Sequence, residues 1–414
     1  MGWLEITQES LKEVVEGLGP EFKTRDVSED PRMTKAYYYL VGERNYHAFV
    51  GRALSEHYKY LGIVAVAEKR NKDRGMHWKK TALSFIIEPE THYKHSSQST
   101  PDLIPQHIPV EELTNNPDFG PQYAGDSFLR RKMRKHQSWY RANVLKLPYS
   151  TGPKPDDTSY YGNMLTRSDG AAGRNFLTKE IFEVVLDRIA QGTGAVEKYR
   201  LLHNMLSSQP MCFNLFAPLV RDRDLAKLLL ETLIPERITE ITRFEIEWSP
   251  KPAVDYLNDH TAFDAFIEYR TTDGQLFGLG IETKLSEPFS QKEYDRPEYR
   301  RWMQLPNSPW LPESWNKVQA IGHNQLWREH LLAVAMRSHP KSTYAKVRLL
   351  LVHHTEDIEC VRNYSNYKNH LQDADDTLFR CSLDQIVDLW SSVVTNEDQK
   401  QWLRSFKKRY TDLD

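Results

Sequence analysis

The chain has 414 residues, of which 27% are charged and 39% hydrophobic, and its formal net charge is −2 at pH 7. This length allows a large core and two or three domains, and the near-zero charge excludes a protein that binds nucleic acid indiscriminately over its surface. No stretch approaches eighteen apolar residues, which excludes an ordinary membrane-spanning helix. The first residues lack the basic and apolar regions of a signal peptide, and three scattered cysteines exclude a disulfide framework, so we expect a cytoplasmic protein.

The first 125 residues are expected to form a separate α+β region. The periodicity of apolar residues predicts two helices and then two strands, at 9–17, 43–60, 61–67 and 81–88. The stretch 92–122 is rich in proline and lacks periodicity, which indicates a long loop. Its histidines, His92, His95 and His107, have no cysteine partners or helical spacing, so we interpret them as structural or solvent-exposed and not as metal ligands.

A cluster of basic residues follows this region. It contains Arg130, Arg131, Lys132, Arg134 and Lys135, directly before Trp139 and Tyr140. Basic side chains beside aromatic rings suit a segment that contacts phosphates and stacks on bases. A solvated helix face with two aromatic anchors explains the pattern equally well.

Helical patterns then alternate with loops up to the first strand of a sheet. Helices are predicted at 178–190, at 196–206 with Pro210 ending or kinking the second, and at 225–238 with an interruption at Pro235. Gln209 and Asn214 are polar positions beside apolar ones, and they either line a site or bond to buried backbone. The segment 244–248 alternates like a strand, and we expect Glu245 and Glu247 to face solvent.

Two further strands carry charges that buried strands normally exclude. Asp264 lies in the apolar run 263–269, and Glu282 and Lys284 lie in the run 276–285, with a hairpin turn between the runs. Side chains alternate along a strand, so Glu282 and Lys284 point to one face. Desolvating a charge costs several kcal/mol unless the charge is paired or metal-bound. If the two strands are neighbours, two carboxylates and one ammonium group meet on one patch.

This combination of residues suits hydrolysis of a phosphodiester. A hard divalent cation neutralises charge on the phosphoryl oxygens and lowers the pKa of an attacking water. Asp264, Glu282 and the carbonyl of Thr283 supply oxygen ligands of the kind magnesium takes, and Lys284 would steady the water or the phosphorus. The alternative is a salt bridge in a half-exposed sheet.

The last expected core elements follow a long loop. Residues 287–314 contain five prolines, several aromatic residues and the pair Arg300 and Arg301, and we interpret the loop as a substrate clamp. A helix is predicted at 314–336, and the continuous apolar run 347–353 predicts a strand buried on both faces. Glycines 278 and 280 within the second charged strand suggest a bulge or a close backbone approach.

Asp264 followed by Glu282-Thr283-Lys284 on the next strand resembles the active site of the PD-(D/E)xK nuclease superfamily, although Phe263 stands where the motif has proline. The segments 207–209, 214–216 and 324–328 also resemble a group of bacterial nuclease-like proteins. The resemblance covers about residues 126–357. It implies a restriction-endonuclease-like α/β fold, in which a helix, a three-strand meander, a helix and a strand form a mixed sheet flanked by helices.

The resemblance divides the chain into an accessory region 1–125, a nuclease-like domain 126–357 and a C-terminal helical extension 358–414. It implies a catalytic role for Gln325, which His323 or Gln319 could fill instead, and a Mg²⁺ cofactor that Mn²⁺ could replace. The function expected is DNA cleavage by an endodeoxyribonuclease in restriction or anti-phage defence, with scope for a homodimer or a partner protein. The alternatives are a catalytically silent subunit that binds nucleic acid or depends on a partner, and an interaction protein whose charges form an internal ion pair.

Overall fold

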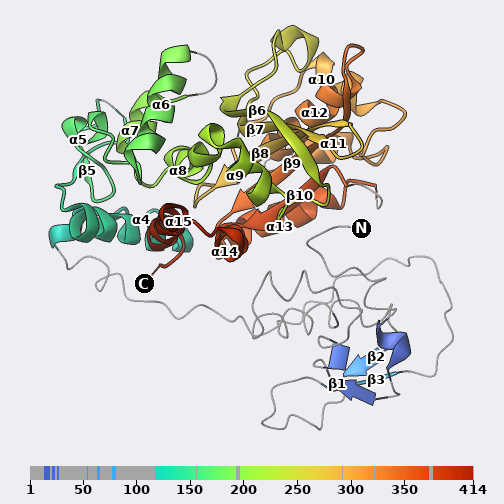
Figure 1. Ribbon diagram of the computed structural model, residues 1–414, viewed down its shortest axis with the longest axis horizontal. Coiled ribbons are helices and arrows are strands. Elements are labelled where there is room, and N and C mark those ends of the chain that lie inside the picture. Colours follow the sequence, from blue (N-terminus) through green and yellow to red (C-terminus); the bar gives the residue numbers. More distant parts are fainter. Residues whose placement is uncertain are drawn as a thin grey trace. The chain divides into compact units, whose positions relative to one another are not determined.

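The computed structural model describes residues 14–18, 21–23, 26–27, 54, 63–65, 77–80, 117–154, 156–192, 196–290, 292–320, 322–372 and 376–413. The contacts within the chain divide it into a small unit, Leu4–Glu112, and a large unit that runs from Leu113 to Asp414 (Figure 1). Among the described residues, no helix is long and apolar enough to cross a membrane.

The small unit contains a three-stranded antiparallel sheet in the order β1-β3-β2. Its strands are β1 (Glu21–Lys23), β2 (Ile63–Ala65) and β3 (His77–Lys80). Strand β2 lies within the predicted strand 61–67, whereas β3 ends just before the predicted strand 81–88. Three predictions lie outside the described residues: the strand 81–88, the three histidines of the loop, and the helix 43–60, of which only Leu54 is described.

The large unit is built on a five-stranded mixed sheet in the order β10-β9-β8-β7-β6 (Figure 1). The strands are β6 (Ile238–Trp248), β7 (Phe263–Thr271), β8 (Leu276–Lys284), β9 (Tyr344–His353) and β10 (Leu378–Ser382). Strands β6, β7 and β8 form an antiparallel meander, and β8, β9 and β10 run parallel. This arrangement confirms the predicted restriction-endonuclease-like α/β core.

Helices cover the sheet. Helices α8 (Ser208–Arg221) and α9 (Arg223–Leu230) pack against the meander, and α12 (Asn324–Ser338) packs against β8 and β9. All residues of β9 from Val347 to His353 are buried, as expected for a strand with helices on both faces. The core beneath α12 includes Phe266 of β7, Leu331 of α12 and Leu349 of β9.

The remaining α-helices of the large unit and one short hairpin surround this core. They are α4 (Phe128–Trp139), β4 (Ser150–Thr151), β5 (Tyr160–Tyr161), α5 (Arg167–Ala171), α6 (Lys179–Gln191), α7 (Lys198–His203), α10 (Pro297–Met303), α11 (Trp315–Val318), α13 (Ile358–Lys368), α14 (Leu383–Val393) and α15 (Glu397–Tyr410). The C-terminal segment 358–414 is therefore not wholly helical, because β10 lies within it and extends the sheet by parallel pairing with β9.

Three helix predictions differ from the structure at proline and turn residues. Pro210 does not end a helix but lies in the first turn of α8, after the cap Ser207, where proline has no backbone hydrogen bond to lose. The predicted helix 225–238 ends at Leu230 as α9, and Ile238 already begins β6. The predicted helix 314–336 is divided into α11 and α12 by a turn around Gly322, which has a positive φ of 91°.

Glycine at position 280 of β8 allows an aromatic ring to lie directly against the strand. A Cβ atom at Gly280 would stand 2.5 Å from ring carbons of Phe263, and one at Gly278 would stand 3.0 Å from the ring of Phe266. The close approach expected from these glycines is confirmed, and it brings Phe263, the neighbour of Asp264, over the strand that carries Glu282.

Gly280→Ala should therefore lower the free energy of unfolding by about 1–3 kcal/mol, because the ring of Phe263 has to move. Denaturant unfolding would measure the loss. Gly278→Ala is the matched comparison and should cost less, because its contacts are longer. Equal stability of Gly280→Ala and the native protein would show that the ring does not require this glycine.

Candidate active site

Asp264 is held at the beginning of β7 by the neighbouring strand. Its Oδ2 accepts hydrogen bonds from the backbone N–H of Thr283 at 2.8 Å and from the Thr283 hydroxyl at 2.6 Å. Ala265 pairs with Ile281 in the antiparallel ladder, so Asp264 lies beside the Glu282–Lys284 end of β8. Thr283, predicted as a carbonyl ligand, is thus observed to orient the Asp264 carboxylate through its other two polar groups.

Glu282 and Lys284 point to the same face of β8, as the alternation of the strand predicts. The Lys284 Nζ lies 3.0 Å from Glu282 Oε1, and both side chains are buried. Gln325 of α12 connects them, because its Nε2 donates to Glu282 Oε1 at 2.7 Å and its Oε1 accepts from Lys284 Nζ at 3.1 Å. The structure therefore brings together the four residues that were predicted to be catalytic.

Two buried acids that the sequence analysis did not assign to the site lie beside this cluster. Glu329, one turn after Gln325 on α12, is 4% exposed and accepts a hydrogen bond from Gln325 Nε2 at 3.0 Å. A carboxylate four residues after a site residue on one helix lies on the same face, and that spacing is the signal that could have identified Glu329.

Glu247 corrects an expectation, because it is 4% exposed and does not face solvent. Its φ of 56° is in the left-handed region, which interrupts the alternation at the end of β6 and turns the side chain inward. Gln209 donates to its Oε1 at 2.5 Å, and Arg188 donates to its backbone carbonyl. Glu245 remains partly exposed and forms an ion pair with Arg243.

Burial and mutual repulsion raise the pKa of all four acids. Burial, and then the charge of Glu282, raises the pKa of Asp264 to about 7, although the bonds from Thr283 oppose the shift. Burial and the charge of Glu329 raise the pKa of Glu282 to about 8. Burial also raises the pKa of Glu329 to about 7 and, together with Asp264, that of Glu247 to about 8.

Lys284 is the cation within this acidic cluster. Burial lowers the pKa of its ammonium group, but the charges of Glu282, Glu329 and Glu287 raise it by more, so its pKa lies above the usual value for lysine. Its Nζ also lies 4.9 Å from the ring centroid of Phe289. Lys284 therefore remains protonated at neutral pH and is available as a fixed positive charge.

The donor set fits a hard divalent cation. The described hydrogen bonds engage only Oδ2 of Asp264 and Oε1 of Glu282, so Oδ1 and Oε2 remain available as ligands. Within the described part of the chain, no group of three or more His, Cys, Asp or Glu side chains is arranged to hold a metal ion. A cation here would rest on two carboxylates, backbone oxygen and water, which is the coordination that magnesium prefers.

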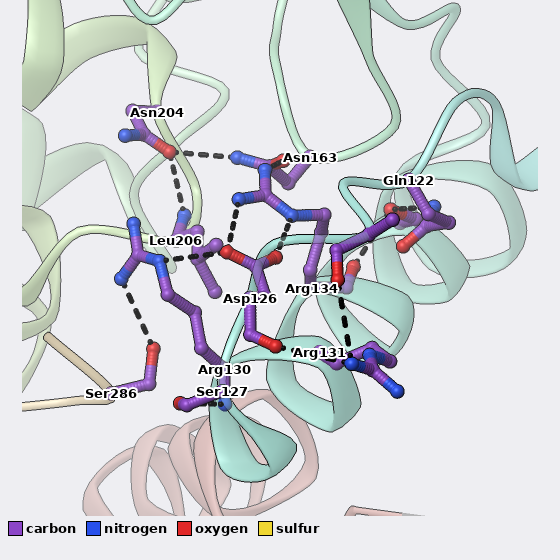
Figure 2. A network of polar contacts seen from close by, with 12 residues as sticks. Gln122, Asp126, Ser127, Arg130, Arg131, Arg134, Asn163, Asn204, Leu206 and Ser286 are labelled. Atoms are coloured by element: carbon purple, nitrogen blue, oxygen red, sulfur yellow. Dashed lines mark hydrogen bonds and ion pairs between the residues drawn. The ribbon is translucent and has the colours of Figure 1, made fainter. Parts of the chain in front are cut away.

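Several basic residues of α4 form structural contacts within the protein. Figure 2 shows Asp126 between Arg130 and Arg134. Arg134 is 7% exposed, and its guanidinium donates to both oxygens of Asp126 and to Asn163. Arg131 donates to the backbone carbonyls of Ala124 and Asp126, and Lys132 pairs with Glu356.

Arg130 is the member of this cluster that approaches the catalytic strand. Its Nε lies 3.2 Å from Asp126, and its Nη1 lies 3.5 Å from the hydroxyl of Ser286, two residues after Lys284 (Figure 2). The charge of Arg130 also reaches Glu287, where burial raises the carboxyl pKa but Arg130 and backbone N–H groups lower it by more. Lys135 is half-buried on the same helix.

The loop after β8 contributes several of its aromatic residues to the core. It contains α10, and Tyr299, Trp302 and Trp310 are all buried in the core beneath α12. Arg300 and Arg301 are exposed, and each guanidinium lies over a tryptophan ring, of Trp315 and Trp302 respectively. Tyr299, Trp302 and Trp310 therefore support the core, and the rings of Trp302 and Trp315 also support the two arginines.

The other polar residues proposed near the site divide into two groups. Asn214 is fully buried and bonds to Leu177, Asn175 and Tyr410, which is a structural role. Gln209 reaches Glu247 at the edge of the acidic cluster. His323 contacts the backbone carbonyl of Lys317, whereas Gln325 is the residue that contacts Glu282 and Lys284. Cys212, Cys360 and Cys381 are free and buried, as expected.

A family model of the PD-(D/E)XK nuclease superfamily matches residues 124–412, and the chain therefore belongs to this superfamily. Members of the superfamily are nucleases that usually use divalent metal ions. Comparison with curated proteins and with solved structures gave no match. The family match extends past residue 357, the expected end of the nuclease-like domain, and includes β10 of the sheet.

The raised pKa values predict that the protein without divalent cations loses stability as the pH rises. Between about pH 5 and pH 8 the folded acids bind more protons than the unfolded acids, so the free energy of unfolding falls with increasing pH. We expect a fall of at least about 1.4 kcal/mol, the value of one pKa unit. Denaturant unfolding across this range in the presence of a chelator would measure it.

Asp264→Asn combined with Glu282→Gln should make that profile shallower, because neither amide titrates, while Glu247 and Glu329 still contribute to the slope. A free energy of unfolding that stays constant or rises with pH in the native protein would show that the carboxylates are not buried as described.

Proposed function

We propose that the chain is a metal-dependent endonuclease that hydrolyses phosphodiester bonds of DNA. The convergence of Asp264, Glu282 and Lys284, bridged by Gln325, carries this proposal. Membership of the nuclease superfamily supports it independently. The same residues argue against a silent binding subunit, because a purely structural role does not require a buried acidic cluster beside a buried lysine.

Each residue has a distinct role in the proposal. Asp264, Glu282 and the carbonyl of Thr283 would hold Mg²⁺, for which Mn²⁺ could substitute, and the bound cation would activate water and neutralise the phosphoryl oxygens. Lys284, kept protonated by its acidic neighbours, would stabilise the negative charge that develops on the phosphoryl oxygens. Gln325 would hold the side chains of Lys284 and Glu282 in position through its two hydrogen bonds to them.

The substrate and the biological setting are further parts of the proposal. We infer DNA as the substrate, and restriction or anti-phage defence as the setting, from the resemblance of the motif and its surrounding segments to nuclease-like proteins of bacteria. Arg130, Lys132, Lys135, Arg300 and Arg301 would contact phosphates where they are accessible, and Arg131 would contribute less because its guanidinium is bound to backbone carbonyls. Arg134, which is buried and bonded to Asp126, would hold helix α4 in place and would not contact phosphate itself.

Lys284→Ala should reduce the rate of plasmid nicking by about 10²–10³-fold, because it removes a fixed charge from the developing phosphoryl charge. The assay compares the native protein and the variant with Mg²⁺, with Mn²⁺ and with a chelator, and circular dichroism checks that the variant is folded. Cleavage that persists in the variant, or that needs no divalent cation, would contradict the proposed mechanism.

Arg130→Gln should weaken DNA binding and reduce the slope of log K against log salt by about 0.9, the value for one phosphate contact. The reason is its position beside Ser286, at the end of the catalytic strand. Binding is measured in the Lys284→Ala background so that the DNA stays intact.

Arg131→Gln removes the same charge from the same helix, but its guanidinium is bound to backbone carbonyls. The slope should change less for this control than for Arg130→Gln. Equal slopes for both variants would show that Arg130 makes no phosphate contact of its own.

A further inference from the structure

All four hydrogen-bonding positions of the Gln325 side-chain amide are occupied. Its Nε2 donates to Glu282 Oε1 at 2.7 Å and to Glu329 Oε1 at 3.0 Å, and its Oε1 accepts from Lys284 Nζ at 3.1 Å and from the backbone N–H of Ser290 at 2.8 Å. A glutamine amide has two N–H groups and two oxygen lone pairs, so this side chain has reached its full hydrogen-bonding capacity.

The two ends of this amide face neighbours of opposite kind. The amino group faces two carboxylates, and the carbonyl oxygen faces an ammonium group and a backbone N–H. A reversed amide would place donor against donor at Lys284 and acceptor against acceptor at Glu282. Buried polar groups that lose their partners are costly, so the four neighbours together fix one orientation.

Glu329 is a buried member of this arrangement. Its side chain is 4% exposed and accepts a hydrogen bond from Gln325, and its carboxyl group also interacts with Glu282 and with the charges of Lys284 and Arg328. Its Oε2 is buried and has no described hydrogen-bond donor. Burying a carboxylate costs free energy, and the direct hydrogen bond of this one goes to Gln325, a residue of the site.

We propose that Glu329 is a positioning residue, which fixes the Gln325 amide so that its carbonyl holds the Lys284 ammonium and its amino group holds Glu282. This inference rests on the proposed nuclease function for its consequence in catalysis. Glu329 acts through Gln325 and does not contact the substrate. The acceptor oxygen is the feature that matters, and the negative charge is secondary.

Two substitutions separate the acceptor from the charge. Glu329→Gln retains a carbonyl oxygen that can accept the bond from Gln325, whereas Glu329→Ala removes it. We expect kcat for DNA cleavage to fall about tenfold in Glu329→Ala with little change in KM, and to stay within about threefold of the native value in Glu329→Gln. Equal losses in both variants, or a loss in neither, would overturn the inference.

A second substitution in α12 serves as a control for general destabilisation of the helix. Val334→Ala removes buried volume from α12 at a position in the apolar core, and kcat of this variant should equal that of the native protein. A comparable loss of kcat in Val334→Ala would show that the effect of Glu329→Ala is general loosening of the helix.

A double-mutant cycle tests whether Glu329 acts through Gln325. If it does, the variant that combines Gln325→Ala with Glu329→Ala should lose no more activity than Gln325→Ala alone. Additive losses would give Glu329 an independent role and would contradict a positioning function.

A spectroscopic measurement tests the inference without cleavage. The side-chain NH₂ resonances of Gln325 can be assigned by their disappearance in Gln325→Ala, and they should shift in Glu329→Ala but much less in Glu329→Gln. Unchanged resonances in Glu329→Ala would refute the positioning role. A native protein that cleaves no DNA, but whose resonances shift as expected, would refute the proposed function and leave the positioning role supported.

Discussion

The ion pair between Lys284 and Glu282 is the contact around which the site is organised. Both groups lie on β8, two residues apart and on one face, and their charged atoms are 3.0 Å apart in a buried environment. A buried pair contributes little net stability, yet loss of one partner leaves an uncompensated charge and costs about 3–5 kcal/mol. The sheet therefore has to bring the remaining partners to this pair, and Asp264 on β7 and Gln325 on α12 are placed accordingly.

The site carries more negative than positive charge. Glu282 and Glu329 interact with the ammonium group of Lys284, and Asp264 and Glu247 extend the acidic cluster. The pKa values of these four carboxyl groups are raised because they are buried and repel one another. Protons relieve this repulsion in the free protein, and a divalent cation would relieve it at neutral pH. The same surplus keeps Lys284 protonated, so one electrostatic arrangement serves both cation binding and stabilisation of the phosphoryl group.

The arginines of α4 show how a basic segment can be divided between structure and surface. Asp126, at the beginning of the helix, binds the guanidinium groups of Arg130 and Arg134, and Asn163 and Asn204 extend the network to the end of α7 (Figure 2). The guanidinium donors of Arg134 are occupied by these bonds, whereas Arg130 reaches the segment that follows β8. The network therefore joins α4 to Asn163 and Asn204 and places one arginine beside the segment that follows β8.

The sequence by itself determined the meander of β6, β7 and β8, the buried strand β9, and the meeting of Asp264, Glu282 and Lys284. These follow from period-two alternation and from the cost of leaving charges unpaired in apolar strands, which are local properties of the chain. Only the tertiary structure decided the remaining partners. Glu329 and Glu247 join the site because helix α12 packs over β8 and because the backbone of Glu247 turns into the left-handed region. Arg134 and Trp302 became structural because distant segments cover them, and neither packing nor a reversed φ is encoded in the spacing of neighbouring residues.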